Sequence, residues 1–231
     1  MKIGIIGAGH IGSTLARRFV DVGHEVSIAN SRGPDTLAEV AAQTGAKPVT
    51  AEQAARAGEV VVVTIPMGKV PELPDDLFAQ VPASVVVVDT CNYYPRERDG
   101  RIAAIEAGLP ESRWVEQQIG RPVIKAFNNI YAAHLGDNGK PAGASGRIAL
   151  PVAGDDEAAK AVVMGLIEQI GFDAIDAGGL DESWRQQPAS PVYTKDFDAA
   201  GVRRGLAEAS PERKPEWKAT DRSPGTYEQP A

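Results

Sequence analysis

The chain has 231 residues, of which 43% are hydrophobic and 24% charged, enough to bury about three quarters of the unfolded surface in one large domain with at most a small appendage. Its net charge of −7 excludes the positive field that nucleic acids and anionic membranes attract, and Cys91 as the single cysteine, with three scattered histidines, indicates no disulfide and no metal site. Because no apolar run approaches the roughly 18 residues of a membrane span and the N-terminus shows no signal cleavage site, we expect a cytoplasmic protein.

Short apolar runs alternate with amphipathic segments over the first 127 residues. Runs that are apolar on successive residues suit strands covered on both faces, as in a parallel sheet. Between the first two runs, Ile11, Leu15 and Phe19 fall at helical spacing, and residues 35–42 and 50–57 favour the next two helices. We therefore predict a doubly wound, Rossmann-type α/β sheet. Its expected strands are residues 3–6, 26–29, 47–49, 60–65, 85–88 and 123–127.

A smaller α/β pattern follows a small-residue connection at residues 140–143. Residues 148–153 and 172–177 favour strands, which either continue the sheet or form a small lobe beside it. The acidic residues 155–157 complement the macrodipole at the start of a helix that runs to Ile170. We predict a nucleotide-binding domain at 1–135, a C-terminal α/β extension at 136–180 and a proline-rich arm at 181–231.

The arm beyond Leu180 shows no clean periodicity. Its six prolines are accompanied by aromatic residues, which disordered tails usually lack. We therefore favour an extended arm that lies on the body or on a second subunit, and because such an arm has large side chains to bury, we expect a homodimer. The aromatic residues are Trp184, Tyr193, Phe197, Trp217 and Tyr227.

Residues 7–12 read G-x-G-x-x-G between a predicted strand and a predicted helix. In that setting Gly7 allows a tight turn, Gly9 lets the backbone approach a pyrophosphate, and Gly12 lets the helix pack on the strand. The helix N-terminus, with His10 and Ile11, supplies N–H donors to phosphate oxygens. The motif predicts a dinucleotide site, with a ligand-free turn as the alternative.

The end of the second strand indicates which dinucleotide binds. An acidic residue there would bind the adenosine ribose and repel a 2′-phosphate, but the chain has Asn30-Ser31-Arg32. An amide, a hydroxyl and a guanidinium favour the 2′-phosphate of NADP; a solvated loop arginine is the alternative. Thr64-Ile65-Pro66 ends the fourth strand at the ligand-binding edge of the sheet, where it can border the nicotinamide.

These segments, together with Val152-Ala153-Gly154-Asp155-Asp156, resemble the NADPH-dependent reductases of coenzyme F-420, a deazaflavin. Asp89-Thr90-Cys91-Asn92-Tyr93 and Lys125-Ala126-Phe127-Asn128-Asn129-Ile130 are similar to the cytosolic reductase domain of the six-transmembrane (STEAP) metalloreductases, which passes hydride from NADPH to a flavin. The resemblance covers residues 1 to about 180. The chain departs from the deazaflavin reductases at Asn128, where they carry a histidine, and it lacks the membrane haem domain of the metalloreductases.

The resemblance implies that the acceptor ring lies beside the nicotinamide and is bordered by Asn92, Asn128, Asn129 and Ile130. The residue pattern agrees in part, because the asparagines follow buried strands and emerge where a ligand needs donors and acceptors. Local loop capping is the alternative. No catalytic side chain is assigned, since hydride transfer needs stacked rings more than an acid or a base.

Three functions are compatible with these features. The first, which we favour, is hydride transfer between NADP(H) and a small planar acceptor such as FMN, FAD or coenzyme F-420. The second is reduction of ketones or imines in the manner of the 3-hydroxyacid dehydrogenases, which share the N-terminal fold but rely on a long helical second domain. The third is a non-catalytic NADP-binding sensor.

Overall fold

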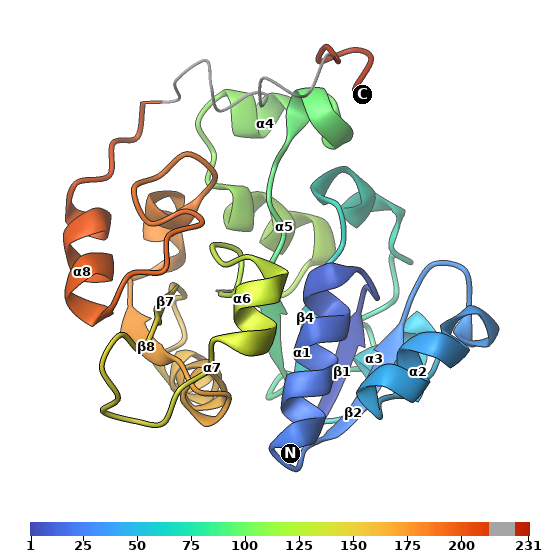
Figure 1. The fold of residues 1–231 in the computed structure, drawn as a ribbon. Helices are drawn as coiled ribbons and strands as arrows, with labels where there is room; N and C mark the ends of the chain where they lie inside the picture. The colour runs from blue at the N-terminus through green and yellow to red at the C-terminus, as the bar shows by residue number, and fades with distance from the viewer. Residues whose placement is uncertain (213–224) are drawn as a thin grey trace.

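The computed structural model describes residues 1–212 and 225–231, and its centre is a parallel sheet (Figure 1). Within these residues six strands pair in the order β3-β2-β1-β4-β5-β6. The order reverses between β1 and β4, the switch point at which ligands of doubly wound sheets bind. The predicted fold class is therefore confirmed. The strands are β1 Lys2–Ile6, β2 Glu25–Ala29, β3 Lys47–Pro48, β4 Val60–Val63, β5 Val86–Asp89 and β6 Ile124–Lys125.

Both faces of the sheet are buried, because side chains alternate across a strand. On β4, Val60 and Val62 pack into one core cluster with Ile3 and Ile5 of β1. Their neighbours at 61 and 63 pack into a second cluster on the opposite face. This two-sided burial explains why the strand segments are apolar at every residue.

Helices cover each face of the sheet (Figure 1). The first cluster includes buried residues of α1 and α6, and the second includes buried residues of α3 and α5. Together with short helical turns labelled η, this part comprises α1 His10–Asp21, η1 Pro34–Leu37, α2 Ala38–Thr44, α3 Ala51–Ala55, η2 Met67–Glu72, η3 Pro95–Asp99, α4 Ala103–Glu106, α5 Glu111–Ile119 and α6 Ala132–Asp137.

Two predicted strands of the central sheet extend at least two residues past the C-terminal end of the observed strand. The run at 60–65 forms a strand only to Val63, and the run at 123–127 forms one only at Ile124–Lys125. Phe127 has a φ of 61°, in the left-handed region that no strand uses. The chain therefore turns away from the sheet immediately before Asn128.

The predicted extension is a small lobe and does not continue the sheet. Strands β7 Ala149–Val152 and β8 Asp173–Asp176 form a separate parallel pair, with α7 Glu157–Gln169 between them in the chain. One antiparallel bridge, Lys125 to Ala153, joins the pair to β6. The predicted boundary at 135/136 falls within α6, and the division into domains stays a prediction.

The expectation that the arm lacks periodic structure is wrong for part of its length. It begins with η4 Leu180–Gln186 and includes α8 Ala199–Ala207, whose Val202 and Leu206 complete a core cluster with Ile175 of β8. Residues 225–231 contact η3, where the Arg96 side chain donates to the carbonyl of Gly225 at 2.8 Å.

The described parts of the arm thus pack on the body of their own chain. Trp217 and the prolines at 215 and 224 lie outside the described residues, and the homodimer stays a prediction. Among the helices that the structure describes, none has the length and apolar character needed to span a membrane.

Candidate functional site

The turn between β1 and α1 is as tight as the glycine pattern predicts. Gly7 has a φ of 120°, and a Cβ on it would lie 2.1 Å from the carbonyl oxygen of Thr64. A Cβ on Gly12 would lie 1.9 Å from the carbonyl oxygen of Gly7. Side chains at these positions would push α1 off the sheet, so both glycines serve the packing of the turn.

Gly9 faces open space instead. A Cβ there would meet no atom within 4 Å. Gly9 is also the N-cap of α1, whose first turn has no side-chain cap and no acidic residue, so the N–H groups of this turn are available to an anion. Around it, His10 is exposed, Ile11 is partly buried against the core and Gly12 is buried.

A cleft of about 880 Å³ extends along the carboxyl ends of β1, β2 and β4. Most of the predicted cofactor residues line it, namely Gly7, Gly9, Asn30-Ser31-Arg32 and Thr64-Ile65-Pro66. Sequence reasoning missed its other wall, because those residues carry no motif of their own. That wall includes Thr50, Glu52, Lys69, Glu72, Leu73 and Pro74.

Asn30 shapes the loop that follows β2. Its amide donates to the Thr36 hydroxyl at 2.9 Å and accepts the backbone N–H of Arg32 at 3.0 Å. The exposed guanidinium of Arg32 makes no hydrogen bond or ion pair with any residue that the structure describes. A fixed loop that presents an unpaired guanidinium to the cleft suits a phosphate dianion. Asn30 is therefore a positioning residue, and Arg32 is the candidate phosphate ligand.

The opposite wall of the cleft carries charge as well. A side-chain hydrogen bond from Thr50 holds the pKa of Glu52 below its ordinary value, so Glu52 is a carboxylate at neutral pH and can accept from N–H or O–H groups of a ligand. Lys69 and Glu72 form an exposed ion pair at 2.7 Å. Since Lys69 is paired, Arg32 is the better placed cation for a phosphate.

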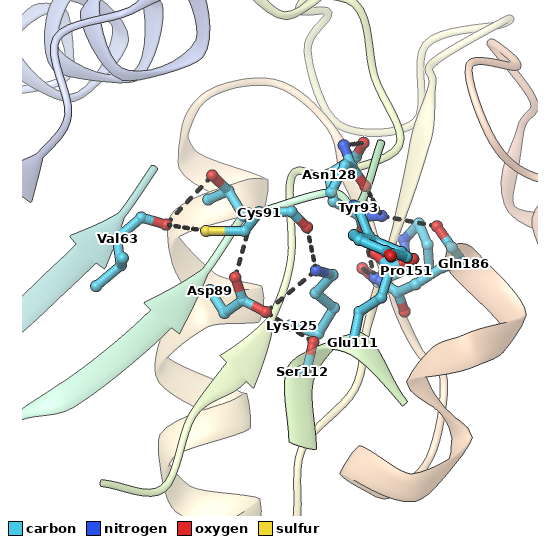
Figure 2. A network of polar contacts seen from close by, with 12 residues as sticks. Val63, Asp89, Cys91, Tyr93, Glu111, Ser112, Lys125, Asn128, Pro151 and Gln186 are labelled. Atoms are coloured by element: carbon cyan, nitrogen blue, oxygen red, sulfur yellow. Dashed lines mark hydrogen bonds and ion pairs between the residues drawn. The ribbon is translucent and has the colours of Figure 1, made fainter. Parts of the chain in front are cut away.

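The carboxyl ends of β5 and β6 carry a buried ion pair (Figure 2). Lys125 Nζ lies 3.1 Å from Asp89 Oδ2, and neither side chain is exposed. Asp89 also accepts the Ser112 hydroxyl at 2.7 Å and the backbone N–H of Cys91 at 2.8 Å, while Lys125 donates to the Cys91 carbonyl. The pair fixes the chain as it leaves β5. Sequence reasoning quoted Asp89 and Lys125 within motifs but assigned them no role.

Cys91 is buried in the same network. Its thiol donates to the Val63 carbonyl at 3.8 Å, and burial raises the pKa of the thiol well above its ordinary value. A buried, protonated thiol is a poor nucleophile, so Cys91 is a packing residue.

The predicted acceptor residues lie beyond the cleft lining, at the ends of β5 and β6. Asn92 Nδ2 donates to the Asn128 carbonyl at 2.9 Å, and Asn128 Nδ2 donates to Asn92 Oδ1 at 3.1 Å. Asn129 is buried, and Ile130 belongs to the first core cluster. The structure therefore brings the asparagines together, and their role toward an acceptor stays a prediction.

Gln186 of η4 completes this group, although sequence reasoning missed it. Asn128 Nδ2 donates to the Gln186 carbonyl at 2.7 Å, and Gln186 Nε2 donates to Asn128 Oδ1 at 3.0 Å and to the Pro151 carbonyl at 3.2 Å (Figure 2). Gln186 is 58 residues from Asn128 in the chain, and no local signal connects the two.

The N-terminal part of the chain is similar to a family of oxidoreductases. The family described as NADP oxidoreductase, coenzyme F420-dependent, matches residues 2–93, which include the glycine turn, the β2 loop and the end of β4. Protein YjhV of Escherichia coli (strain K12) is 43% identical over 86 residues, which make up 37% of this chain and 56% of YjhV. The chain thus spans about half the length of this curated relative.

Two solved structures are similar over most of the chain. The hypothetical protein SMa0349 of Sinorhizobium meliloti has 32% sequence identity and a TM-score of 0.72, covering 85% of this chain and 95% of its own. The "putative F420 dependent NADP-reductase" of Arthrobacter sp. FB24 has 25% identity and a TM-score of 0.64, covering 79% and 87%. The resemblance to the metalloreductases stays a prediction.

Proposed function

We propose that the chain, whose residues 2–93 match the family of coenzyme F420-dependent NADP oxidoreductases, transfers hydride between NADP(H) and a flavin, deazaflavin or similar planar acceptor. The observation that carries the proposal is the cleft at the switch point of the sheet. There Gly9 leaves room for a pyrophosphate, and Arg32 presents an unpaired cation where an NAD-binding sheet would carry an acid.

In this proposal, each segment that lines the cleft binds a different part of the cofactor. The uncapped first turn of α1 binds the pyrophosphate through backbone N–H groups. Asn30 fixes the loop from which Arg32 and Ser31 reach the 2′-phosphate. Thr64-Ile65-Pro66 borders the nicotinamide, which places the reacting ring toward the ends of β5 and β6.

Bound NADPH supplies a hydride, which is one proton with two electrons, and the acceptor takes it up together with a solvent proton as its ring is reduced. The protein's contribution is to hold two rings in contact and to limit access of water. That task requires no acid and base dyad, in agreement with the absence of an assigned catalytic side chain.

Steady-state oxidation of NADPH with a panel of acceptors tests the proposal. The panel contains FMN, FAD, coenzyme F-420, quinones, ferric chelates, ketones and imines. We expect turnover with at least one of the three ring cofactors and a much higher efficiency with NADPH than with NADH. Turnover confined to ketones or imines would favour the second function named above, and NADPH binding without turnover on any acceptor would favour a sensor.

The second function finds less support in the lobe that follows β6. In the described residues after β6 the longest helix is α7, with 13 residues, and the lobe contains a two-stranded sheet. The dehydrogenases of that type rely on a long helical second domain, and the described residues after β6 contain no such helices.

A further inference from the structure

Residues 186–194, here called the strap, lie over the ends of β5 and β6. Gln186 exchanges two hydrogen bonds with Asn128, at 2.7 and 3.0 Å. At the other end of the strap, the Thr194 N–H donates to the Asn129 carbonyl at 2.8 Å, and the hydroxyl of Tyr193 is hydrogen-bonded to that of Tyr94. The strap therefore covers the edge at which the acceptor is expected.

Beneath the strap, two neighbouring asparagines differ completely in their hydrogen bonding. Asn128 uses both ends of its amide, toward Asn92 and Gln186. Asn129 has only 1% of its surface exposed, and neither its Nδ2 nor its Oδ1 has a hydrogen-bond partner among the described residues. Buried amides are almost always paired. An unpaired one at this edge indicates a polar group that is absent from the structure.

Val192 anchors one part of the strap in the core cluster that includes Val202, whereas the rest of the strap carries strained backbone and unpaired polar groups. Ala189 and Thr194 have φ values of 68° and 55°, a region that L residues adopt at a cost. The buried Gln187 Nε2 and Ser190 Oγ also have no partner within the described chain. Strained backbone and unpaired buried polar groups raise the free energy of the closed strap and so favour its opening.

We propose that the strap is a movable cover over the acceptor site, and that the Asn129 amide beneath it recognises an acceptor with a carbonyl next to an N–H. The inference rests on the proposed function. An amide presents one acceptor and one donor side by side, which matches the pyrimidine edge of flavins and deazaflavins. Quinones and ferric chelates have no such edge. The strap belongs to the arm, beyond residues 2–93, which match the family.

The Tyr94–Tyr193 hydrogen bond is the latch of this cover, and Tyr193→Phe removes it while leaving the ring in place. One neutral hydrogen bond corresponds to roughly a 2- to 13-fold change in the opening equilibrium. Stopped-flow fluorescence should show FMN associating faster by that factor, because only the open fraction binds. Exchange of the Thr194 amide hydrogen in the free protein should accelerate equally.

Ser84→Ala is the control, because it also removes one hydroxyl. Ser84 is exposed in the loop before β5, and its hydroxyl has no hydrogen-bond partner among the described residues, so both rates should stay as in the wild type. Unchanged rates in Tyr193→Phe, or an equal acceleration in both variants, would overturn the role of the strap.

Recognition by Asn129 is tested by the dissociation constants of FMN and N3-methyl FMN, measured by flavin fluorescence with NADP⁺ present. The wild type should bind FMN about 10-fold more tightly, because methylation removes the N–H that pairs with the amide oxygen. Asn129→Leu should bind the two flavins equally.

Equal affinities in the wild type, or no binding of FMN, would overturn this inference. These readouts are independent of turnover. Selective FMN binding without NADPH oxidation on any acceptor would refute the proposed function and leave the recognition by Asn129 standing.

Discussion

Two stretches along the carboxyl edge of the sheet differ in whether their polar groups are open to a ligand or bonded within the protein. At the ends of β1, β2 and β4, the turn N–H groups and the Arg32 guanidinium are left open to a cleft. At the ends of β5 and β6, Asp89, Lys125 and Asn128 are buried and bonded to one another or to neighbouring segments. The first stretch is a preformed site, and the second is closed.

This difference determines how much free energy a ligand gains on binding at each stretch. A ligand that enters the open stretch meets donors that lose only water, so the protein need not rearrange. A ligand that approaches the closed stretch must first displace internal hydrogen bonds, and its apparent affinity falls with the fraction of molecules that are open. We therefore expect variants of the closed stretch to affect stability and variants of the open stretch to affect cofactor binding.

The largest effect is expected from Lys125→Met. It leaves the Asp89 carboxylate buried without its cation, and breaking a buried ion pair from one side costs about 3–5 kcal/mol. Urea unfolding should show this loss in the free energy of unfolding. The control is the double variant Asp89→Asn with Lys125→Met, whose amide oxygen can still accept the Cys91 N–H and whose amide nitrogen can donate to the Ser112 hydroxyl, but which carries no buried charge.

The double variant should be more stable than Lys125→Met alone. If the single variant loses less than about 1 kcal/mol of unfolding free energy, the ion pair does not hold the ends of β5 and β6. The closed stretch would then not differ from the open one in its internal bonding energy.

Arg32→Ala tests the open stretch. A hydrogen bond to a charged group contributes about 1.5–3 kcal/mol, so the variant should bind NADPH roughly 10- to 150-fold more weakly while NADH affinity and unfolding free energy barely change. Fluorescence titration with both cofactors measures this. Arg203→Ala, an exposed arginine of α8, controls for net charge. Equal losses for both cofactors would show that Arg32 does not contact the 2′-phosphate.

The open stretch was predictable because its chemistry is local. The G-x-G-x-x-G pattern and Asn30-Ser31-Arg32 each lie within a few residues, between elements of clear hydrophobic period, and the structure places them on one cleft. The closed stretch depends on distant contacts. The hydroxyl pair of Tyr94 and Tyr193 spans 99 residues, and no periodicity links such positions.

Helix α8 escaped prediction for a related reason. It contains Gly201 and Gly205, which lower helix propensity, and only Val202 and Leu206 form an apolar stripe. The structure explains the glycines, because a Cβ on either one would lie 2.8 Å from Phe197 or Val192. Tertiary packing against the strap and the segment that follows it thus overrides the local preference.

Asn128 and Asn129 are neighbours in the chain, but only the amide of Asn128 is hydrogen-bonded within the described residues. Asn128→Leu leaves Asn92 and Gln186 groups buried and unpaired, which should cost about 1–3 kcal/mol of unfolding free energy. Asn129→Leu removes an amide that has no partner in the described chain, so the free protein should keep its stability or gain some. Thermal and urea unfolding of both variants without ligand measure the contrast. Equal destabilisation would mean that Asn129 is paired internally.

The smallest effect concerns how the segment before the strap is attached. Asp155 accepts the backbone N–H of Leu180 at 2.8 Å and Arg113 Nη2 at 2.6 Å, and these contacts, the backbone hydrogen bond first, hold the pKa of Asp155 below its ordinary value. A carboxyl group whose pKa is lower in the folded protein stabilises the fold above its unfolded pKa of about 3.9, and that stability is lost as the pH falls through the folded value. Asp155→Asn should therefore lower the Tm at neutral pH, by an amount that corresponds to less than about 1 kcal/mol because the side chain is half exposed. The difference from the wild type should shrink as the pH falls through the folded pKa of Asp155. Asp75→Asn, an exposed loop residue, controls for the change in net charge. A difference that persists undiminished at acid pH would show that the carboxylate charge has no part in attaching η4.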